Sequence, residues 1–202
     1  MNPSRVAAVR QKLEARLKEL SVTFPANRSS RWEYAKFPDM AVVYRFVAGP
    51  SLVPDQMSFA HGVAALLKEQ DNPDVIARAC RAYPALVRQH HFELLLRERG
   101  NFSLVVHSTD LDLEGIDILV VEEGIAAGLR LSVQTPAAAF WKVIKAKRHP
   151  IPRGLAVLDL EAKPDGYRIG QFWLHSPDQV DVVRAFVDRL RDHVTIDRSG
   201  YD

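Results

Sequence analysis

The chain has little cysteine and no long apolar run. Cys80 is the single cysteine among 202 residues. One cysteine cannot form an internal disulfide framework or a cysteine-based zinc site, and its helical surroundings predict a small core residue. No stretch approaches the roughly 18 consecutive apolar residues of a membrane span. The N-terminus also lacks the apolar core and small-residue cleavage site of a signal peptide. We therefore expect a cytoplasmic protein without a membrane segment.

Several enzyme signatures are also missing. No glycine-rich loop is followed by Lys-Ser or Lys-Thr, which argues against a P-loop nucleotide hydrolase. No Gly-x-Ser-x-Gly elbow occurs, which argues against a serine hydrolase, and no paired-histidine zinc signature is present. The formal net charge is only +2, so a wholly basic nucleic-acid coat is excluded and any anion-binding surface must be local.

Charge is segregated strongly in the middle of the chain. No lysine or arginine interrupts an acidic cluster made of Asp110, Asp112, Glu114, Asp117, Glu122 and Glu123. No acid occurs from Gly124 to Leu158, a range that contains Arg130, Lys142, Lys145, Lys147, Arg148 and Arg153. Carboxylates beside cations are what a divalent metal and a phosphate backbone need in one place. The alternative is a charge-segregated surface that evens out in three dimensions.

The first part of the chain predicts a mainly helical extension. Apolar residues at three- and four-residue spacing predict helices over residues 3–20 and 55–70. Residues 21–37 are polar and predict a loop, and residues 40–47 are rich in Val, Tyr and Phe and predict a strand. We expect residues 1–72 to form an N-terminal helical extension or interaction arm, through which a protein partner or a second copy of the chain could bind.

The remainder, residues 73–202, predicts an α/β core. A long helix is expected over Pro73–Arg99, with Gly100 as its stop signal and a kink or split at Pro84. The pattern then predicts strands at 102–107, 116–121 and 129–133, a helix at 136–147, strands at 154–160 and 167–174, and a last helix at 177–194. The order favours a mixed central sheet flanked by helices.

Asp117 is the most informative residue of this core. It lies in the apolar run Gly115–Val120, near the start of an expected strand. A carboxylate there is costly to desolvate unless something pairs with it, and a metal ion would compensate that cost. The alternative is an aspartate at a strand end, in water or salt-bridged to Arg130.

Two segments resemble the motifs of the PD-(D/E)XK nuclease superfamily. They are Asp112-Leu113-Glu114-Gly115-Ile116-Asp117 and Leu129-Arg130-Leu131-Ser132-Val133-Gln134-Thr135. Members often have a glycine–hydrophobic–aspartate strand, then a strand with an acid or glutamine, one intervening residue and a lysine. A preceding helix commonly supplies a glutamate. The resemblance covers roughly residues 85–175, and its motifs are short. It implies a restriction-endonuclease-like core and metal-dependent cleavage of DNA.

Carried over residue by residue, the resemblance assigns Asp117 to the metal-binding aspartate and Glu93 to the accessory glutamate. Ser132 stands where the second acid belongs and Gln134 where the lysine belongs, so this chain departs from the pattern twice. Serine brings no negative charge and glutamine no cation. Lys142 and Lys145, three apart on the predicted helix, are the candidates to supply the missing cation.

The sequence therefore predicts a Mg²⁺ or Mn²⁺ site at Glu93 and Asp117. It also predicts a DNA-binding surface that contains Arg130, Lys142, Lys145, Lys147 and Arg148. A nuclease of this kind would suit restriction, phage defence or a mobile element, which rests on fold analogy alone. Two alternatives stay open: a catalytically degenerate relative that binds nucleic acid or a protein, and an unrelated α/β domain whose charge order is accidental.

Overall fold

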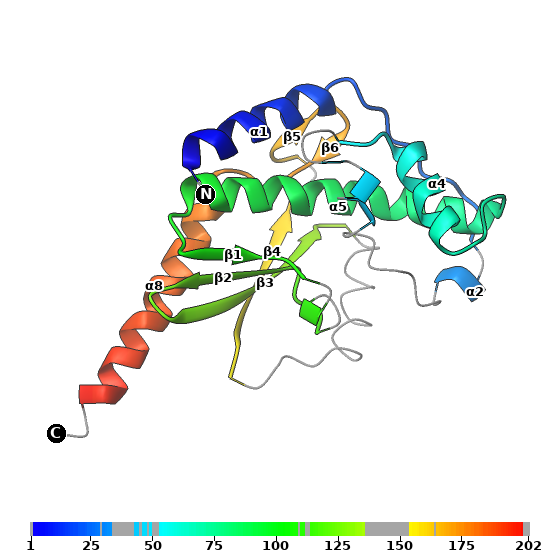
Figure 1. Cartoon of the computed structure of the whole chain (residues 1–202). Helices are drawn as coiled ribbons and strands as arrows, with labels where there is room; N and C mark the ends of the chain where they lie inside the picture. Colours follow the sequence, from blue (N-terminus) through cyan, green and yellow to red (C-terminus); the bar gives the residue numbers. More distant parts are fainter. Residues whose placement is uncertain are drawn as a thin grey trace.

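The computed structural model describes residues 2–28, 30–33, 43–44, 46–47, 49, 53–108, 110–111, 114–135, 154–163 and 165–199. Its helices are α1 (Pro3–Leu17), α2 (Ser30–Glu33), α4 (Gln56–Leu66), α5 (Pro73–Arg99) and α8 (Asp178–Ser199). Its strands are β1 (Leu104–Val106), β2 (Ile118–Glu122), β3 (Ile125–Val133), β4 (Ala156–Ala162), β5 (Arg168–Ile169) and β6 (Phe172–Trp173). Figure 1 shows α5 crossing the sheet, with α1 on the far side of α5 from the strands.

The main sheet is mixed. Its strand order is β1-β2-β3-β4, in which the first three strands are antiparallel and β4 runs parallel to β3. The tight turn between β2 and β3 uses Glu123 and Gly124, both with positive φ, as a two-residue hairpin requires. The predicted α/β class with a mixed sheet is confirmed.

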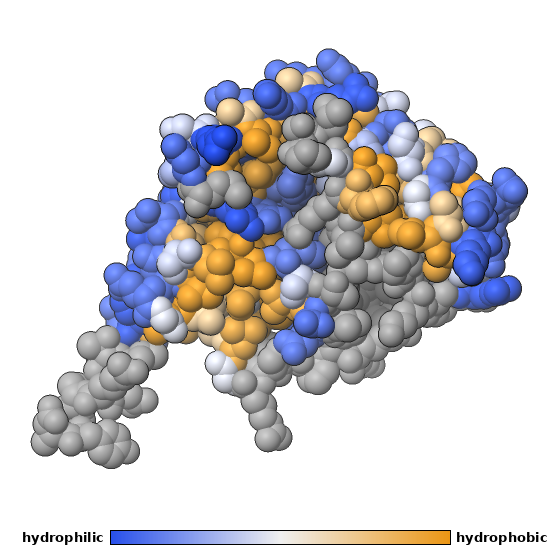
Figure 2. Space-filling model, in the orientation of Figure 1, coloured by the Kyte–Doolittle hydropathy of each residue, from blue (hydrophilic) through white to orange (hydrophobic). Residues whose placement is uncertain are grey.

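The two faces of this sheet differ. One face buries Ile118, Val120 and Leu129 against apolar side chains of α5 and α8. Side chains alternate along a strand, so the other face carries Leu104 and its cross-strand partner Val121, with Leu104 51% exposed. Figure 2 shows apolar surface gathered over β1 and β2. The helix predicted at 136–147 lies outside the described residues.

A second core joins distant parts of the chain. Leu13 and Leu17 of α1, Phe59 of α4 and Tyr83 of α5 pack in one buried cluster with Phe172 of β6. Where the β5–β6 turn meets the end of α1, a Cβ on Gly170 would lie 2.4 Å from the Leu17 carbonyl oxygen. The assignment of residues 1–72 to a separate extension stays a prediction. Two helices of this range, α1 and α4, both pack on α5.

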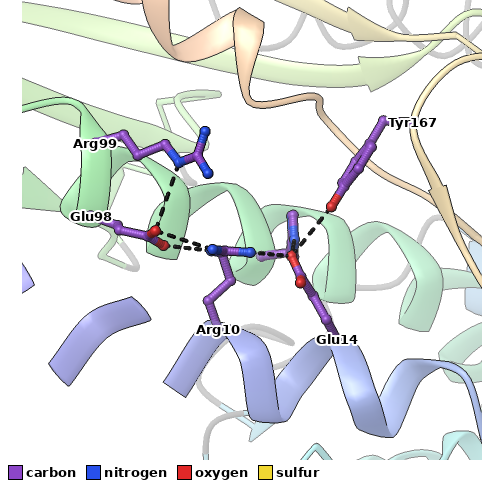
Figure 3. Close-up of polar contacts among 6 residues, drawn as sticks. Arg10, Glu14, Glu98, Arg99 and Tyr167 are labelled. Atoms are coloured by element: carbon purple, nitrogen blue, oxygen red, sulfur yellow. Dashed lines mark hydrogen bonds and ion pairs between the residues drawn. The ribbon is translucent and has the colours of Figure 1, made fainter. Parts of the chain in front are cut away.

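A partly buried polar network also holds α1 against α5 (Figure 3). Arg10 donates to Glu98 through Nε and Nη2, and to Glu14 through Nη1 at 2.5 Å. The same Glu14 oxygen lies 2.9 Å from Nε2 of His91 and accepts from the Tyr167 hydroxyl at 3.3 Å. Because a carboxylate only accepts, His91 carries its proton on Nε2. The network lowers the pKa of Glu14 to about 2, mainly through the His91 hydrogen bond.

Two strand predictions were wrong. Val43, Tyr44, Phe46 and Val47 are helical, so the Val- and aromatic-rich segment 40–47 is no strand in its described part. Residues 167–174 form a short separate hairpin, β5–β6, and do not extend the main sheet. In both places aromatic side chains fill the core against α5, and tertiary packing outweighs local strand propensity.

Of the two outcomes predicted at Pro84, a kink or a split, the split does not occur. Helix α5 is continuous over 27 residues with Pro84 inside it. Proline has no amide hydrogen, so the carbonyl of Cys80, four residues earlier, loses its helical donor. Nε2 of Gln56, at the start of α4, donates to this carbonyl oxygen at 2.8 Å in the protein interior. The Gln56 side-chain oxygen in turn accepts from the Thr23 amide at 2.8 Å. A side chain from another helix thus replaces the bond that proline removes.

We expect Gln56→Met to lower the free energy of unfolding by about 2 kcal/mol, because it leaves the Cys80 carbonyl and the Thr23 amide without a hydrogen-bond partner. Pro84→Ala restores a backbone donor for the Cys80 carbonyl. In a Pro84→Ala background the Gln56→Met cost should therefore shrink. Urea unfolding of the two single variants and the double variant measures this coupling. Equal costs in both backgrounds would contradict the role given to Gln56.

None of the helices in the described ranges combines the length and apolarity that crossing a bilayer requires.

Candidate functional site at the ends of β3 and β4

Asp117 lies immediately before β2, at one edge of the main sheet. Its amide donates to the Leu129 carbonyl at 2.9 Å, and its Oδ2 accepts from the Leu131 amide at 2.6 Å. Because β2 is antiparallel to β3 and β3 is parallel to β4, the start of β2 lies at the carboxyl ends of the other two strands. Ligands of open α/β sheets commonly bind at such an edge. Asp117 is a partly exposed residue there.

Helix α5 reaches the same edge through two adjacent residues. Nε2 of Gln89 donates to the Asp117 carbonyl oxygen at 2.8 Å. Nε of Arg88 donates to the Trp173 carbonyl oxygen of β6, also at 2.8 Å. The Arg88 side chain is 7% exposed. Asp117 therefore lies against a turn of α5 that presents an amide and a guanidinium.

Glu93 lies one turn further along α5 and is also buried, with 7% of its surface exposed. Glu93 therefore does not lie on a solvated face of the helix. Its Oε1 accepts from Arg97 Nη2 at 2.9 Å, and Arg97 also donates to the Val105 carbonyl on β1. His90 Nδ1 lies 3.9 Å from Oε2. Since four helical residues span about 6 Å, Glu93 is displaced along α5 from the point where Gln89 meets Asp117.

The β3 residues of the second motif lie beside acids of β4. Ser132 is paired in register with Glu161, and Arg130 with Asp159. Nε of Arg130 donates to the Gly115 carbonyl at 3.1 Å, two residues before Asp117. Glu161 of β4 therefore lies beside Ser132, the β3 residue that stands where the resemblance expects an acid.

Gln134 follows the end of β3 at the same edge. It is exposed, and its amide donates to the Ala162 carbonyl of β4 at 2.9 Å. The neighbouring Val133 carbonyl, a further candidate metal ligand, already accepts from the Thr135 amide at 2.9 Å. Gln134 therefore lies just past the end of β3 and brings no charge.

The donor set fits a magnesium ion bound mainly through Asp117. Mg²⁺ is typically held by one or two carboxylates together with waters and substrate phosphates. Asp117 meets the minimum of one carboxylate, whereas Glu93 is engaged by Arg97. Within the described ranges no cluster of three or more His, Cys, Asp or Glu side chains is arranged to hold a metal.

Most of the predicted basic surface falls outside the described residues. This applies to Lys142, Lys145, Lys147 and Arg148, whose roles stay predictions. Arg130 is described, and its Nε donates to the Gly115 carbonyl near Asp117; its DNA-binding role also stays a prediction.

Two histidines, His91 on α5 and His175 beside it, lie in the protein interior and not at the boundary between the core and the solvent. His91 and His175 are both fully buried. The His175 ring packs at a tilt against Phe92, with ring centroids 4.8 Å apart, and its Nδ1 lies 2.9 Å from Oε1 of Gln179. Burial lowers the pKa of His91 and lowers that of His175 to about 4. Both rings are therefore neutral near pH 7, and neither is placed as a general base.

Sequence reasoning missed Arg88 and Gln89. A signal for Arg88 was present, because it lies one residue after Val87 and four before Phe92, on the stripe that α5 buries. A charged residue on a buried stripe needs a partner or a ligand. Gln89 gave no such signal, since its role depends on how the β2 edge docks against the helix.

Comparisons of the chain with protein-family models, with curated proteins and with solved structures give no match.

Proposed function

We propose that the protein is a metal-dependent nuclease that hydrolyses DNA phosphodiester bonds at the edge formed by Asp117 and the ends of β3 and β4. The observation that carries this proposal is the position of Asp117. Asp117, a partly exposed residue, stands at the carboxyl ends of two parallel strands, beside a turn of α5 that carries Arg88 and Gln89.

The topology agrees with the resemblance to PD-(D/E)XK nucleases. A long helix is followed by a three-stranded antiparallel meander and then by a strand parallel to the third. This order supports a restriction-endonuclease-like core. Asp117 and Gln134, the residues to which the resemblance carries over two of its motif positions, lie at neighbouring strand ends, which supports the proposal.

A bound Mg²⁺ would polarise the phosphate and lower the pKa of an attacking water. Asp117 would hold this ion. In hydrolysis the water oxygen forms a bond to phosphorus as the bond to the leaving sugar oxygen breaks. The water proton is lost and the leaving oxygen takes up a proton. The chain must also supply a cation to the phosphate oxygens, because charge develops there.

The direct test is cleavage of single- and double-stranded DNA with Mg²⁺ and with Mn²⁺. Binding of either metal is measured in parallel by calorimetry. Cleavage that requires the metal supports the proposal. A protein that binds no metal and cleaves none of these substrates overturns it.

A degenerate nuclease fold that binds nucleic acid or a protein is the second candidate. The ion pair between Glu93 and Arg97 favours it, because it removes the accessory glutamate from metal binding. Metal-independent DNA binding without cleavage would identify this case.

The nuclease, and the nucleic-acid-binding form of the second candidate, both predict that the basic segment after β3 binds DNA. We expect the Lys142→Ala, Lys145→Ala, Arg148→Ala triple variant to bind DNA far more weakly, and wild-type affinity to fall roughly 10³-fold between low and moderate salt. Fluorescence anisotropy over a salt series measures both effects. A triple variant that binds as tightly as the wild type would contradict the assignment of these residues.

A further inference from the structure

Arg88 is nearly buried, yet most of its hydrogen-bonding capacity is unused. A guanidinium has five N–H donors. Among the described residues, its only hydrogen bond runs from Nε to the Trp173 carbonyl. Some polar side-chain atoms in the described part of the chain have neither solvent contact nor a hydrogen-bond partner, and the two Nη atoms of Arg88 are not among them. The two Nη atoms therefore keep contact with solvent and are available to a ligand.

Arg10 shows what a purely structural buried arginine looks like in this protein. It is 8% exposed, close to the value for Arg88. Its Nε, Nη1 and Nη2 all donate to carboxylates, those of Glu14 and Glu98. Arg88 has no such acceptors in the described ranges, so its burial is not explained by an internal network.

Arg88 is charged under ordinary conditions in spite of its burial. Desolvation lowers its pKa to about 10, and the nearby Asp117 carboxylate acts in the opposite direction. A cation with free donors thus stands near the candidate metal ligand. The contact between Gln89 and the Asp117 carbonyl ties both to the same turn of α5.

We propose that the Arg88 guanidinium binds a non-bridging oxygen of a phosphate group held beside Asp117. A guanidinium fork matches phosphate geometry better than a single ammonium does. Arg88 then takes the part that a strand lysine would play, and Gln134 need not be a cation. Its role in cleavage rests on the proposed function, whereas phosphate binding by Arg88 stands without it.

The test is a titration with inorganic phosphate in the presence of Mg²⁺ at constant ionic strength, followed by calorimetry. Arg88→Gln should weaken phosphate binding about 10- to 100-fold, the range for a lost charge-assisted hydrogen bond. Arg184→Gln is the matched control. Arg184 also donates to a backbone carbonyl, that of Gly100, but at the opposite end of β2. Its replacement should leave phosphate affinity unchanged.

A second measurement uses the wild-type protein, so it does not depend on the folding of Arg88→Gln. The ¹⁵N signal of the Arg88 side chain, assigned by its loss in Arg88→Lys, should shift with phosphate while that of Arg184 stays in place. An Arg88 signal that phosphate does not move overturns the proposal. So does a folded Arg88→Gln variant with wild-type phosphate affinity.

Cleavage assays on the same samples separate this proposal from the proposed function. Phosphate binding that depends on Arg88, in a protein that cleaves no DNA, supports the anion site and rejects the nuclease. Cleavage that is unaffected in Arg88→Gln supports the nuclease and rejects the role of Arg88.

Discussion

Asp117→Asn should abolish metal-dependent DNA cleavage while leaving the fold intact. An amide is a poor Mg²⁺ ligand and brings no charge. Losing several kcal/mol of transition-state stabilisation corresponds to a rate lower by on the order of 10³-fold. In the wild type the Leu131 amide donates a hydrogen bond to Oδ2 of Asp117. The fold should survive because the asparagine side-chain oxygen can still accept this hydrogen bond. Single-turnover cleavage rates and calorimetric Mn²⁺ binding are the measurements.

Asp110→Asn is the control for this variant. It makes the same chemical change on an exposed residue of the same acidic cluster, so cleavage should be unchanged. If both variants cleave at the wild-type rate, the metal site is elsewhere.

Gln134→Lys tests the departure at the second motif. If the missing strand cation limits the reaction, this variant should cleave faster than the wild type. If Arg88 or a lysine of the segment after β3 already supplies the charge, the new lysine should change the rate little. Alanine at the responsible lysine should then silence the enzyme.

Glu14→Ala should be strongly destabilising. Glu14 accepts from Arg10 and Tyr167 and contacts the fully buried Nε2 of His91. Breaking a fully buried pair costs about 3–5 kcal/mol. The Glu14 side chain keeps 18% exposure, so we expect a loss of about 2–3 kcal/mol in the free energy of unfolding, scaled down from that range. Glu19→Ala is the control, because Glu19 forms an exposed pair with Arg16 and should cost under about 1 kcal/mol.

The same groups make the protein sensitive to acid. The folded pKa values of His91 and His175 lie below their ordinary 6.5. The unfolded chain therefore takes up protons first, and stability falls as pH drops below about 6.5. Glu14 adds stability above its ordinary pKa of 4.5, which is lost between 4.5 and about 2. Urea unfolding from pH 7 to pH 3 should show a steady decline. In Glu14→Gln the part of the decline below pH 4.5 should be smaller, and an unchanged slope there would contradict the network.

The periodic elements of the core could be predicted from the sequence. Apolar spacing located α5 and α8, and glycine-bounded runs located the three strands of the meander, although β3 starts at Ile125 and not at the predicted Leu129. The register between β3 and β4 could not be predicted, because it depends on a crossover and on long-range pairing. This is why Glu161 was not recognised as the neighbour of Ser132. The strand prediction over 40–47 failed because aromatic and β-branched residues suit a helix packed on α5 as well as a strand.

The candidate site could be predicted only in part. The position of Asp117 at a strand start followed from its apolar surroundings. The sequence could not show that the ion pair between Glu93 and Arg97 is partly buried, because the same four-residue spacing also produces exposed ion pairs on a helix. The role of Gln56 could not be predicted for a similar reason. A polar residue at the start of a helix is ordinary, and only the folded structure brings Gln56 to the Cys80 carbonyl that Pro84 leaves without a helical donor.

The contact between Glu14 and Tyr167 has a consequence for the time course of biosynthesis. The two residues are 153 positions apart, so at about 5–20 residues per second the ribosome needs roughly 8–30 seconds to make the second after the first. During this interval α1 can already dock on α5, but the β5–β6 hairpin that it contacts has yet to be synthesised. The apolar side of α1, which buries Val6, Leu13 and Leu17 in the folded protein, is therefore incompletely covered for many seconds, so a chaperone could hold this segment until the hairpin emerges.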